Sequence, residues 1–339
     1  MVDATSPSII QRRQFFAQAD QPDDVLYSSP SVTMKATRYL LSLAAILQLA
    51  ACNDSGTESA DQPQAREKPQ VYATNYPLKW FADKMAGDFA DIVYPAPSDE
   101  DPAFWKPDDE TVSKFQQADV ILMNGATYSK WADRVTLPAS KIVDTSASFA
   151  PSFIIVQGAT THSHGPGGEH SHSGTAFTTW LDLQQGIQQA AAVRDALQKI
   201  VPQQKDKITE HFNTIKASLE ALDQRLLAVG KRMANAPIVA SHPIYQYLAR
   251  RYGINLKPML WEPEVVPDDK AMADLQTLLA THPAKWMIWE GEPAAESIAK
   301  LKAIGVASVV FDPCGNTPET GDFISVLTAD VENLEKAFP

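Results

Sequence analysis

The chain has 339 residues, of which 44% are hydrophobic and 21% are charged, so it is long enough to bury a core in two domains or in two lobes of one fold. Its 41 acidic residues outnumber its 29 basic ones and give a formal net charge of −12, which argues against a nucleic-acid-binding protein, because such proteins need a basic surface. Two cysteines exclude a disulfide scaffold, and the chain lacks a run of about 18 apolar residues that could span a membrane.

The residues 34–51 have the pattern of a secretory signal peptide. Lys35 and Arg38 give it a positive start, an apolar stretch follows, and small residues stand directly before Cys52. The end of this segment resembles a bacterial lipobox, and that resemblance implies cleavage before Cys52 and lipid attachment to its sulfur. A buried amphipathic helix with an incidental cysteine is the alternative. We expect residues 1–33 to be a gene-model extension, with a cytoplasmic tail as the alternative.

The residues 52–69 are expected to form the lipidated cysteine and a flexible tether, because the segment is polar and poor in aromatic and β-branched side chains. A lipid anchor and a tether would hold the rest of the chain near a membrane, in the periplasm or at the cell surface. Cys314 is the other cysteine of the chain, so we expect no intrachain disulfide after processing.

The residues 70–182 are predicted to form an N-terminal α/β lobe. Short apolar runs bounded by turn residues predict strands, and apolar residues at helical spacing predict helices between them. The predicted strands are 71–75, 91–94, 120–124 and 141–144, and the predicted helices are 77–87 and 111–118. Strands that alternate with helices favour a parallel sheet.

The residues 183–235 are predicted to be a helical connector with helices at 183–200 and 205–234. Apolar residues recur every three or four positions along the second helix: Ile208, Phe212, Ile215, Leu219, Leu222, Leu226, Val229 and Met233. A helix of some 28 residues is about 42 Å long, so we interpret it as a rigid backbone that joins two lobes. A coiled coil is the alternative, but the segment is short and has few paired charges.

The residues 236–339 repeat the alternation and are predicted to form a C-terminal α/β lobe. Its predicted strands are 237–241, 257–261, 286–290 and 308–312, and its predicted helices are 243–253, 268–281, 293–305 and 322–338. The predicted fold class is therefore α/β, with two lobes that each hold a mainly parallel sheet flanked by helices, joined by one long helix.

Polar side chains follow the predicted strands of the second lobe. His242, Glu262, Glu290 and Asp312 each stand at or just past the end of a strand. Ligands of open α/β sheets bind at the carboxyl ends of the strands. These four side chains are therefore predicted to converge on one site.

The residues 160–175 are rich in histidine and glycine. His162, His164, His170 and His172 account for four of the seven histidines of the chain. Neutral imidazole is a common ligand of Zn²⁺, Cu²⁺ and Ni²⁺, and clustered histidines are typical of metal binding. A solvated polar linker is the alternative interpretation.

Several motifs together resemble a family of bacterial metal receptors. They are YATNYPL at 72–78, DPAFWKP at 101–107, ADV at 118–120, WLD at 180–182, ASHPIYQYLARRYG at 240–253 and FDPCG at 311–315. In this order they are similar to the metal-binding solute-binding proteins of ABC transporters for zinc and manganese, over about residues 70–339. The resemblance implies that two lobes clasp one ion, which a membrane permease with its ATPase then imports. Histidine ligands favour Zn²⁺ over Mn²⁺.

The chain departs from the ligand pattern that the resemblance implies. His242 and Asp312 match two of the family's ligand positions in the second lobe. Ala103 and Thr178 stand where the family has the two histidines of the first lobe. Two protein ligands alone would hold Zn²⁺ weakly.

Three arrangements could compensate for the two missing histidines. The histidine-rich loop could fold into the cleft and supply imidazoles, which is the arrangement we favour. Carboxylates could replace them, either from residues 99–101, which include Asp101, or from Glu262 and Glu290. As a third possibility, the cleft could take a different ligand.

The function predicted from these observations is capture of a divalent transition metal, Zn²⁺ first and Mn²⁺ second, by a monomeric, membrane-anchored receptor. A metal buffer or an adhesin-like surface protein with the same fold is the alternative. We expect no enzymatic activity, because hydrolytic motifs such as H-E-x-x-H and G-x-S-x-G do not occur. His211 and His282 are expected at the surface, and Cys314 is expected to pack in a turn.

Overall fold

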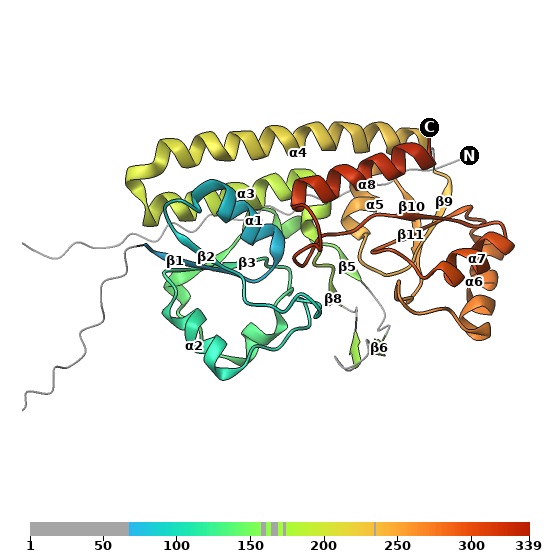
Figure 1. Cartoon of the computed structure of the whole chain (residues 1–339), viewed down its shortest axis with the longest axis horizontal. Helices are drawn as coiled ribbons and strands as arrows, with labels where there is room; N and C mark the ends of the chain where they lie inside the picture. Colours follow the sequence, from blue (N-terminus) through green and yellow to red (C-terminus); the bar gives the residue numbers. More distant parts are fainter. Residues whose placement is uncertain (1–67, 157–160, 164–168, 172–173, 234) are drawn as a thin grey trace, which may run out of the picture. The chain divides into compact units, whose positions relative to one another are not determined.

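The computed structural model describes residues 68–156, 161–163, 169–171, 174–233 and 235–339 (Figure 1). The predicted extension, the signal peptide, Cys52 and the tether up to residue 67 lie outside the described residues, as do His164 and His172. Among the helices of the described part, none combines the length and the apolar character needed to cross a membrane.

The N-terminal lobe is built on a parallel four-stranded sheet. Its strands are β1 Gln70–Ala73, β2 Asp91–Val93, β3 Val120–Met123 and β4 Ile142–Asp144, in the spatial order β2-β1-β3-β4. The helices α1 Tyr76–Ala86 and α2 Asp109–Gln117 connect the first three strands. Asn75 and Asp108 cap these helices, because each side chain accepts a hydrogen bond from the backbone N–H three residues on.

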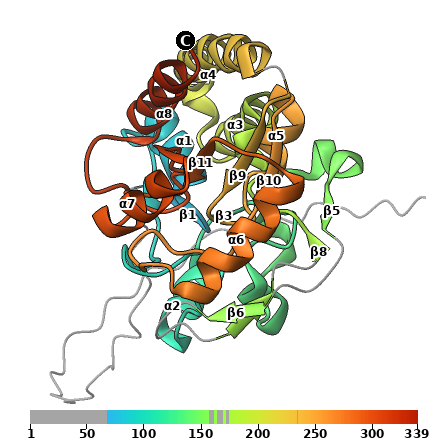
Figure 2. The same ribbon diagram turned by 90° about the vertical axis from the view of Figure 1, so that its right-hand side faces the viewer.

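The C-terminal lobe repeats this topology. Its strands are β9 Pro237–Ala240, β10 Asn255–Pro258, β11 Trp286–Trp289 and β12 Ala307–Val310, in the order β10-β9-β11-β12, and all neighbouring pairs are parallel. Its connecting helices are α5 Gln246–Tyr252, α6 Asp269–Thr281 and α7 Ala295–Ala303 (Figure 2). Both lobes are thus parallel α/β units, which confirms the predicted fold class.

The long helix α4 Lys205–Met233 lies along both lobes (Figure 1). Between it and the N-terminal lobe lies α3 Leu183–Ile200, which contacts α4 and α1, and α8 Phe323–Ala337 packs against α4 and β12. All eight apolar residues that defined the periodicity of α4 are buried in one core shared with both sheets. Arg225 of α4 forms a two-pronged ion pair with Glu335 of α8, with N–O distances of 3.1 and 2.7 Å. Near its end, α4 approaches α5 so closely that a Cβ at Gly230 would stand 2.0 Å from the carbonyl oxygen of Tyr252. The long-helix prediction is therefore confirmed.

The structure differs from the sequence prediction in the strand predicted at 257–261 and in His282. That strand begins earlier, as β10, because Asn255 already pairs with Pro237 of β9. His282 was expected at the surface but is 4% exposed, since its Nε2 lies 2.9 Å from the carbonyl oxygen of Ile238.

Two short antiparallel pairs interrupt the first lobe and were not predicted. They are β5 Ile155–Val156 with β8 Gly174–Thr175, and β6 Thr161–Ser163 with β7 Glu169–Ser171. The remaining short elements are the 3₁₀ helices η1 Lys130–Arg134, η2 Ala139–Lys141, η3 Ala147–Ser152, η5 Thr179–Leu181 and η6 Pro202–Gln204.

Candidate metal centre

Three adjacent strands of the C-terminal lobe each deliver one ligand-type side chain at their carboxyl end. His242 stands two residues after β9, Glu262 follows β10, and Glu290 comes directly after β11. Backbone hydrogen bonds fix the three loops to one another: the N–H of Ser241 donates to Ile288, and that of Trp261 donates to Ser241. Because β9 lies between β10 and β11, the three side chains meet at one edge of the sheet.

These three residues, which we call the acidic triad, form a compact donor set. His242 Nδ1 lies 3.3 Å from Glu290 Oε1 and 3.6 Å from Glu262 Oε1. One ligand atom from each residue lies within 4.8 Å of the others. The imidazole is buried and each glutamate side chain is 23% exposed, so the carboxylates line the approach to the histidine. An imidazole nitrogen and two carboxylate oxygens at this spacing are suited to a divalent cation.

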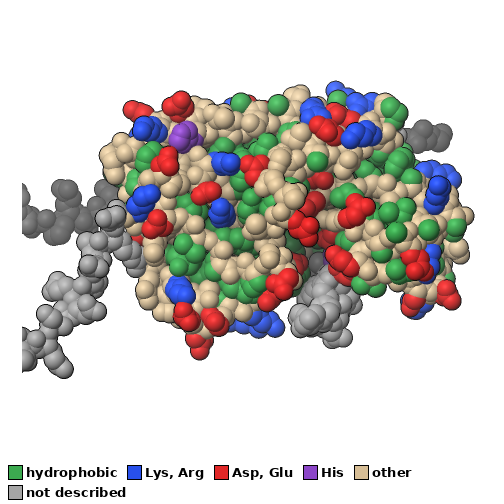
Figure 3. All heavy atoms as spheres, viewed as in Figure 1, with side chains coloured by type: hydrophobic (Ala, Val, Ile, Leu, Met, Phe, Trp, Pro, Cys, Tyr) green, Lys and Arg blue, Asp and Glu red, His purple; other side chains and the backbone are tan. Residues whose placement is uncertain are grey.

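The electrostatics of the triad also favour a bound cation. The pKa of Glu290 is raised well above its ordinary value, first by burial and then by the charges of Glu262, Asp101, Asp312 and Glu264. Crowded carboxylates repel one another, and a divalent cation among them would offset this repulsion. Figure 3 shows acidic side chains gathered along the middle of one face, between the two lobes.

Asp312 follows β12 and stands beside the triad without belonging to it: among the described residues, the group with ligand atoms within 4.8 Å is the triad alone. Its Oδ1 accepts a hydrogen bond of 2.7 Å from the backbone N–H of Cys314. Burial raises the pKa of Asp312, and this hydrogen bond opposes the shift. Cys314 itself is 2% exposed in the turn, at φ +52°, in agreement with the expectation that it packs there.

Sequence reasoning did not single out Asp330, a buried acid on α8. Its Oδ1 accepts a hydrogen bond of 3.0 Å from the backbone N–H of Asp312, and the residue is 3% exposed. Burial raises the pKa of Asp330 to about 8. Asp330 lies three residues after Leu327 and four before Leu334, so the helical spacing already places it on the buried face of α8.

Asp330→Asn is expected to remove a pH dependence of stability. The unfolded aspartate releases its proton near pH 4, whereas folded Asp330 keeps it to about pH 8. The contribution of Asp330 to the free energy of unfolding is therefore fully present below about pH 4 and is lost as the pH rises to about 8. An amide imitates the protonated acid, so the metal-free variant should match the wild type near pH 4 and melt several degrees higher near pH 9. An equal melting temperature near pH 9 would contradict this.

The first lobe places no histidine in the described part of the site. Ala103 is 1% exposed and its backbone N–H donates to Asp101 Oδ1 at 2.8 Å. Thr178 is 4% exposed, and its hydroxyl donates to the carbonyl oxygen of Ile244. Asp101 is exposed, and its charge reaches Glu290, whose pKa it raises.

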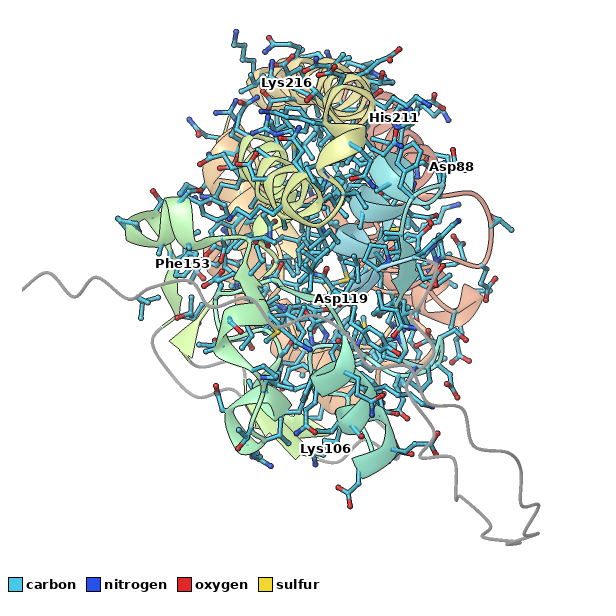
Figure 4. All side chains as sticks on the ribbon, turned by 90° about the vertical axis from the view of Figure 1, so that its left-hand side faces the viewer. Asp88, Lys106, Asp119, Phe153, His211 and Lys216 are labelled. Carbon is cyan, nitrogen blue, oxygen red and sulfur yellow. The ribbon has the colours of Figure 1, made fainter. Side chains whose placement is uncertain are left out.

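The structure describes only part of the histidine-rich segment. The backbones of His162 and His170 belong to β6 and β7, where the strand register pairs the two residues. The prediction that these histidines fill the cleft therefore stays a prediction. His211 lies on α4, where Figure 4 labels it, and its Nδ1 is 3.0 Å from the carbonyl oxygen of Met85.

Comparisons with known proteins agree with this architecture. Residues 71–337 match the family described as ZnuA, zinc-uptake complex component A, periplasmic. The zinc-binding lipoprotein AdcA of Streptococcus pneumoniae is 24% identical over 317 residues, an alignment that covers 89% of this chain and 61% of AdcA. The high-affinity zinc uptake system protein ZnuA of Bacillus subtilis is 23% identical over 302 residues, covering 86% of this chain and 94% of that protein.

A solved structure shows the same fold. The Zn(II)-bound ZnuA-like domain of Streptococcus pneumoniae AdcA superposes with a TM-score of 0.67 at 20% identity, covering 80% of this chain and 99% of that domain. The chain spans about three-fifths of the length of the AdcA proteins that it matches.

Proposed function

Because the chain belongs to the zinc-uptake component A family, we propose that it captures Zn²⁺ outside the cytoplasm and delivers it to the permease of an ABC importer. The family consists of uptake components and not of enzymes, in agreement with the sequence-based expectation. The observation that carries the proposal is the acidic triad, in which His242, Glu262 and Glu290 present one nitrogen and two oxygen donors within 4.8 Å.

The chemistry of the triad fits a transported ion. Zn²⁺ accepts imidazole nitrogen and carboxylate oxygen at about 2.0–2.2 Å, and a site with three protein ligands keeps a fourth position open. An open position allows the ion to leave again, as delivery requires. The two carboxylates also suit Mn²⁺, whereas the imidazole favours Zn²⁺. We expect Asp312 and Asp101 to add negative charge around the ion.

The N-terminal pattern and the relatives support a location at the membrane surface. AdcA of Streptococcus pneumoniae is a zinc-binding lipoprotein, and the family is described as a periplasmic component. We propose that Cys52 carries the lipid anchor and that the chain works as a monomer at the membrane surface, on the permease and its ATPase.

Calorimetric titration of Zn²⁺ and Mn²⁺ into the metal-stripped protein tests this function. We expect one Zn²⁺ per chain, bound more tightly than Mn²⁺. A variant without residues 162–172 separates the two sources of ligands: the triad predicts that tight binding survives, with the loop as an accessory. Loss of tight binding with the loop would instead place His162, His164, His170 and His172 in the site. No binding by either protein would overturn the proposed function.

A further inference from the structure

A short segment before α3 contacts the loop that carries His242. Thr178 is buried, and its hydroxyl donates a hydrogen bond to the carbonyl oxygen of Ile244, two residues after His242. Only Pro243 separates His242 from Ile244, so a shift of Ile244 also displaces His242. The first-lobe position that lacks a histidine is therefore tied directly to the ligand loop of the second lobe.

The same segment contacts the loop that carries Asp312. Trp180 is 1% exposed, and its Nε1 donates a hydrogen bond of 2.7 Å to the carbonyl oxygen of Pro313, the next residue after Asp312. The indole also lies against Gly315, where an added Cβ would stand 3.5 Å from the ring. The loops after β9 and β12, the strands on either side of β11, thus share one support.

A buried neutral network holds this support in place. Asn124 Nδ2 donates to the carbonyl oxygen of Phe177 at 2.9 Å, and Thr179 Oγ1 donates to Gln189 Oε1 at 3.1 Å. Gln189 Nε2 and Asn75 Nδ2 both donate to Asn124 Oδ1, at 3.0 and 3.1 Å. Asn75, Asn124, Thr179 and Gln189 are at most 1% exposed. Such fully bonded buried networks are rigid.

The network lies where a ligand would be expected in the first lobe. Asn75 and Asn124 follow β1 and β3, at the carboxyl ends of two neighbouring strands. In the second lobe the corresponding strands, β9 and β11, lead to His242 and Glu290 of the acidic triad. In the first lobe, amide and hydroxyl groups take this position and support the segment at 177–181.

We propose that Thr178 and Trp180 are positioning residues, through which the first lobe fixes the ligand loops of the second lobe. The inference rests on the proposed function. Groups that orient metal ligands affect affinity by about 10–100-fold when they are removed. Thr178 acts through the backbone beside His242, so its hydroxyl sets the direction of the imidazole.

Thr178→Val tests the proposal, because valine keeps the shape of threonine and removes the hydroxyl donor. We expect the affinity for Zn²⁺ to fall by about tenfold and the visible absorption spectrum of bound Co²⁺ to change, since it reports ligand geometry. Thr178→Ser keeps the donor and should restore both. Thr209→Val is the matched control, because it removes a hydroxyl that donates to the carbonyl oxygen of Lys205 within α4.

The outcomes of this experiment separate the positioning role of Thr178 from the proposed function. Wild-type affinity and an unchanged Co²⁺ spectrum in Thr178→Val would overturn the positioning role and leave the proposed function standing. An equal loss in Thr178→Ser would also overturn it. Absence of Zn²⁺ binding in the wild type would overturn the proposed function, and the positioning role with it. Should Thr178→Val fail to fold, Trp180→Phe removes the bond to Pro313 and the indole contact with Gly315, and the same tenfold loss is expected.

Discussion

His242→Ala is expected to lower the affinity for Zn²⁺ by more than about 100-fold, beyond the range for removal of a group that only orients a ligand. The imidazole is the one nitrogen donor of the acidic triad, and its Nδ1 is the atom that faces both glutamates. Without it, two carboxylates remain, which suit harder ions such as Mn²⁺. The preference for Zn²⁺ over Mn²⁺ should therefore fall together with the affinity.

Glu290→Gln tests the contribution of a triad carboxylate to metal binding. Gln keeps the size of the side chain and removes the charge, so the affinity for both ions should fall while the fold is kept. His211→Ala is the matched control, because His211 lies on α4 and bonds to the carbonyl oxygen of Met85. Calorimetric titration of each variant gives the affinities. Unchanged Zn²⁺ affinity in His242→Ala would contradict the assignment of the triad.

Asp223→Ala is expected to lower the free energy of unfolding by about 1.5–3 kcal/mol, the range for hydrogen bonds to a charged group, because the Arg251 side chain that is left behind is 29% exposed. Asp223 of α4 is fully buried and accepts two hydrogen bonds from Arg251 of α5, at 3.0 and 2.7 Å. Tyr252 and Gln184 also donate to it, at 3.0 and 3.1 Å. One carboxylate thus connects α3, α4 and α5.

The pH dependence of this pair has a definite sign. Burial would raise the pKa of Asp223, but the hydrogen bonds from Arg251, Tyr252 and Gln184 outweigh it, so the pKa lies below its ordinary value. Its stabilisation is therefore present above about pH 4 and is lost at lower pH. Urea unfolding near pH 7 should show the full difference in the free energy of unfolding between the wild type and Asp223→Ala. Near pH 2 this difference should be much smaller. Asp206→Ala, at the exposed start of the same helix, should change stability little. A similar loss in both variants would contradict the role of Asp223.

Much of the fold could be predicted from local patterns. The helix at 205–233 has apolar residues at helical spacing over its whole length, and such a pattern does not depend on the rest of the chain. The strands are short, apolar and bounded by turns, and the rule that ligands lie at their carboxyl ends led to Glu262 and Glu290. That rule placed them in one region but could not decide which side chains meet.

Features that depend on tertiary packing could not be predicted. His282 is buried against the carbonyl oxygen of Ile238, 44 residues away, and the bond from Thr178 to Ile244 spans 66 residues. Thr178 in place of an expected histidine suggested the loss of a metal ligand, whereas its side chain contacts the loop that carries His242. The sequence carries no local signal of such a contact.

The most direct test of the proposed metal centre is a crystal structure of the Zn²⁺-loaded protein, with anomalous diffraction measured at the zinc edge. We predict one strong peak between His242, Glu262 and Glu290, at about 2.0–2.2 Å from Nδ1 of the imidazole and from one oxygen of each carboxylate. A single peak held by the histidines of residues 160–175, away from the triad, would contradict it.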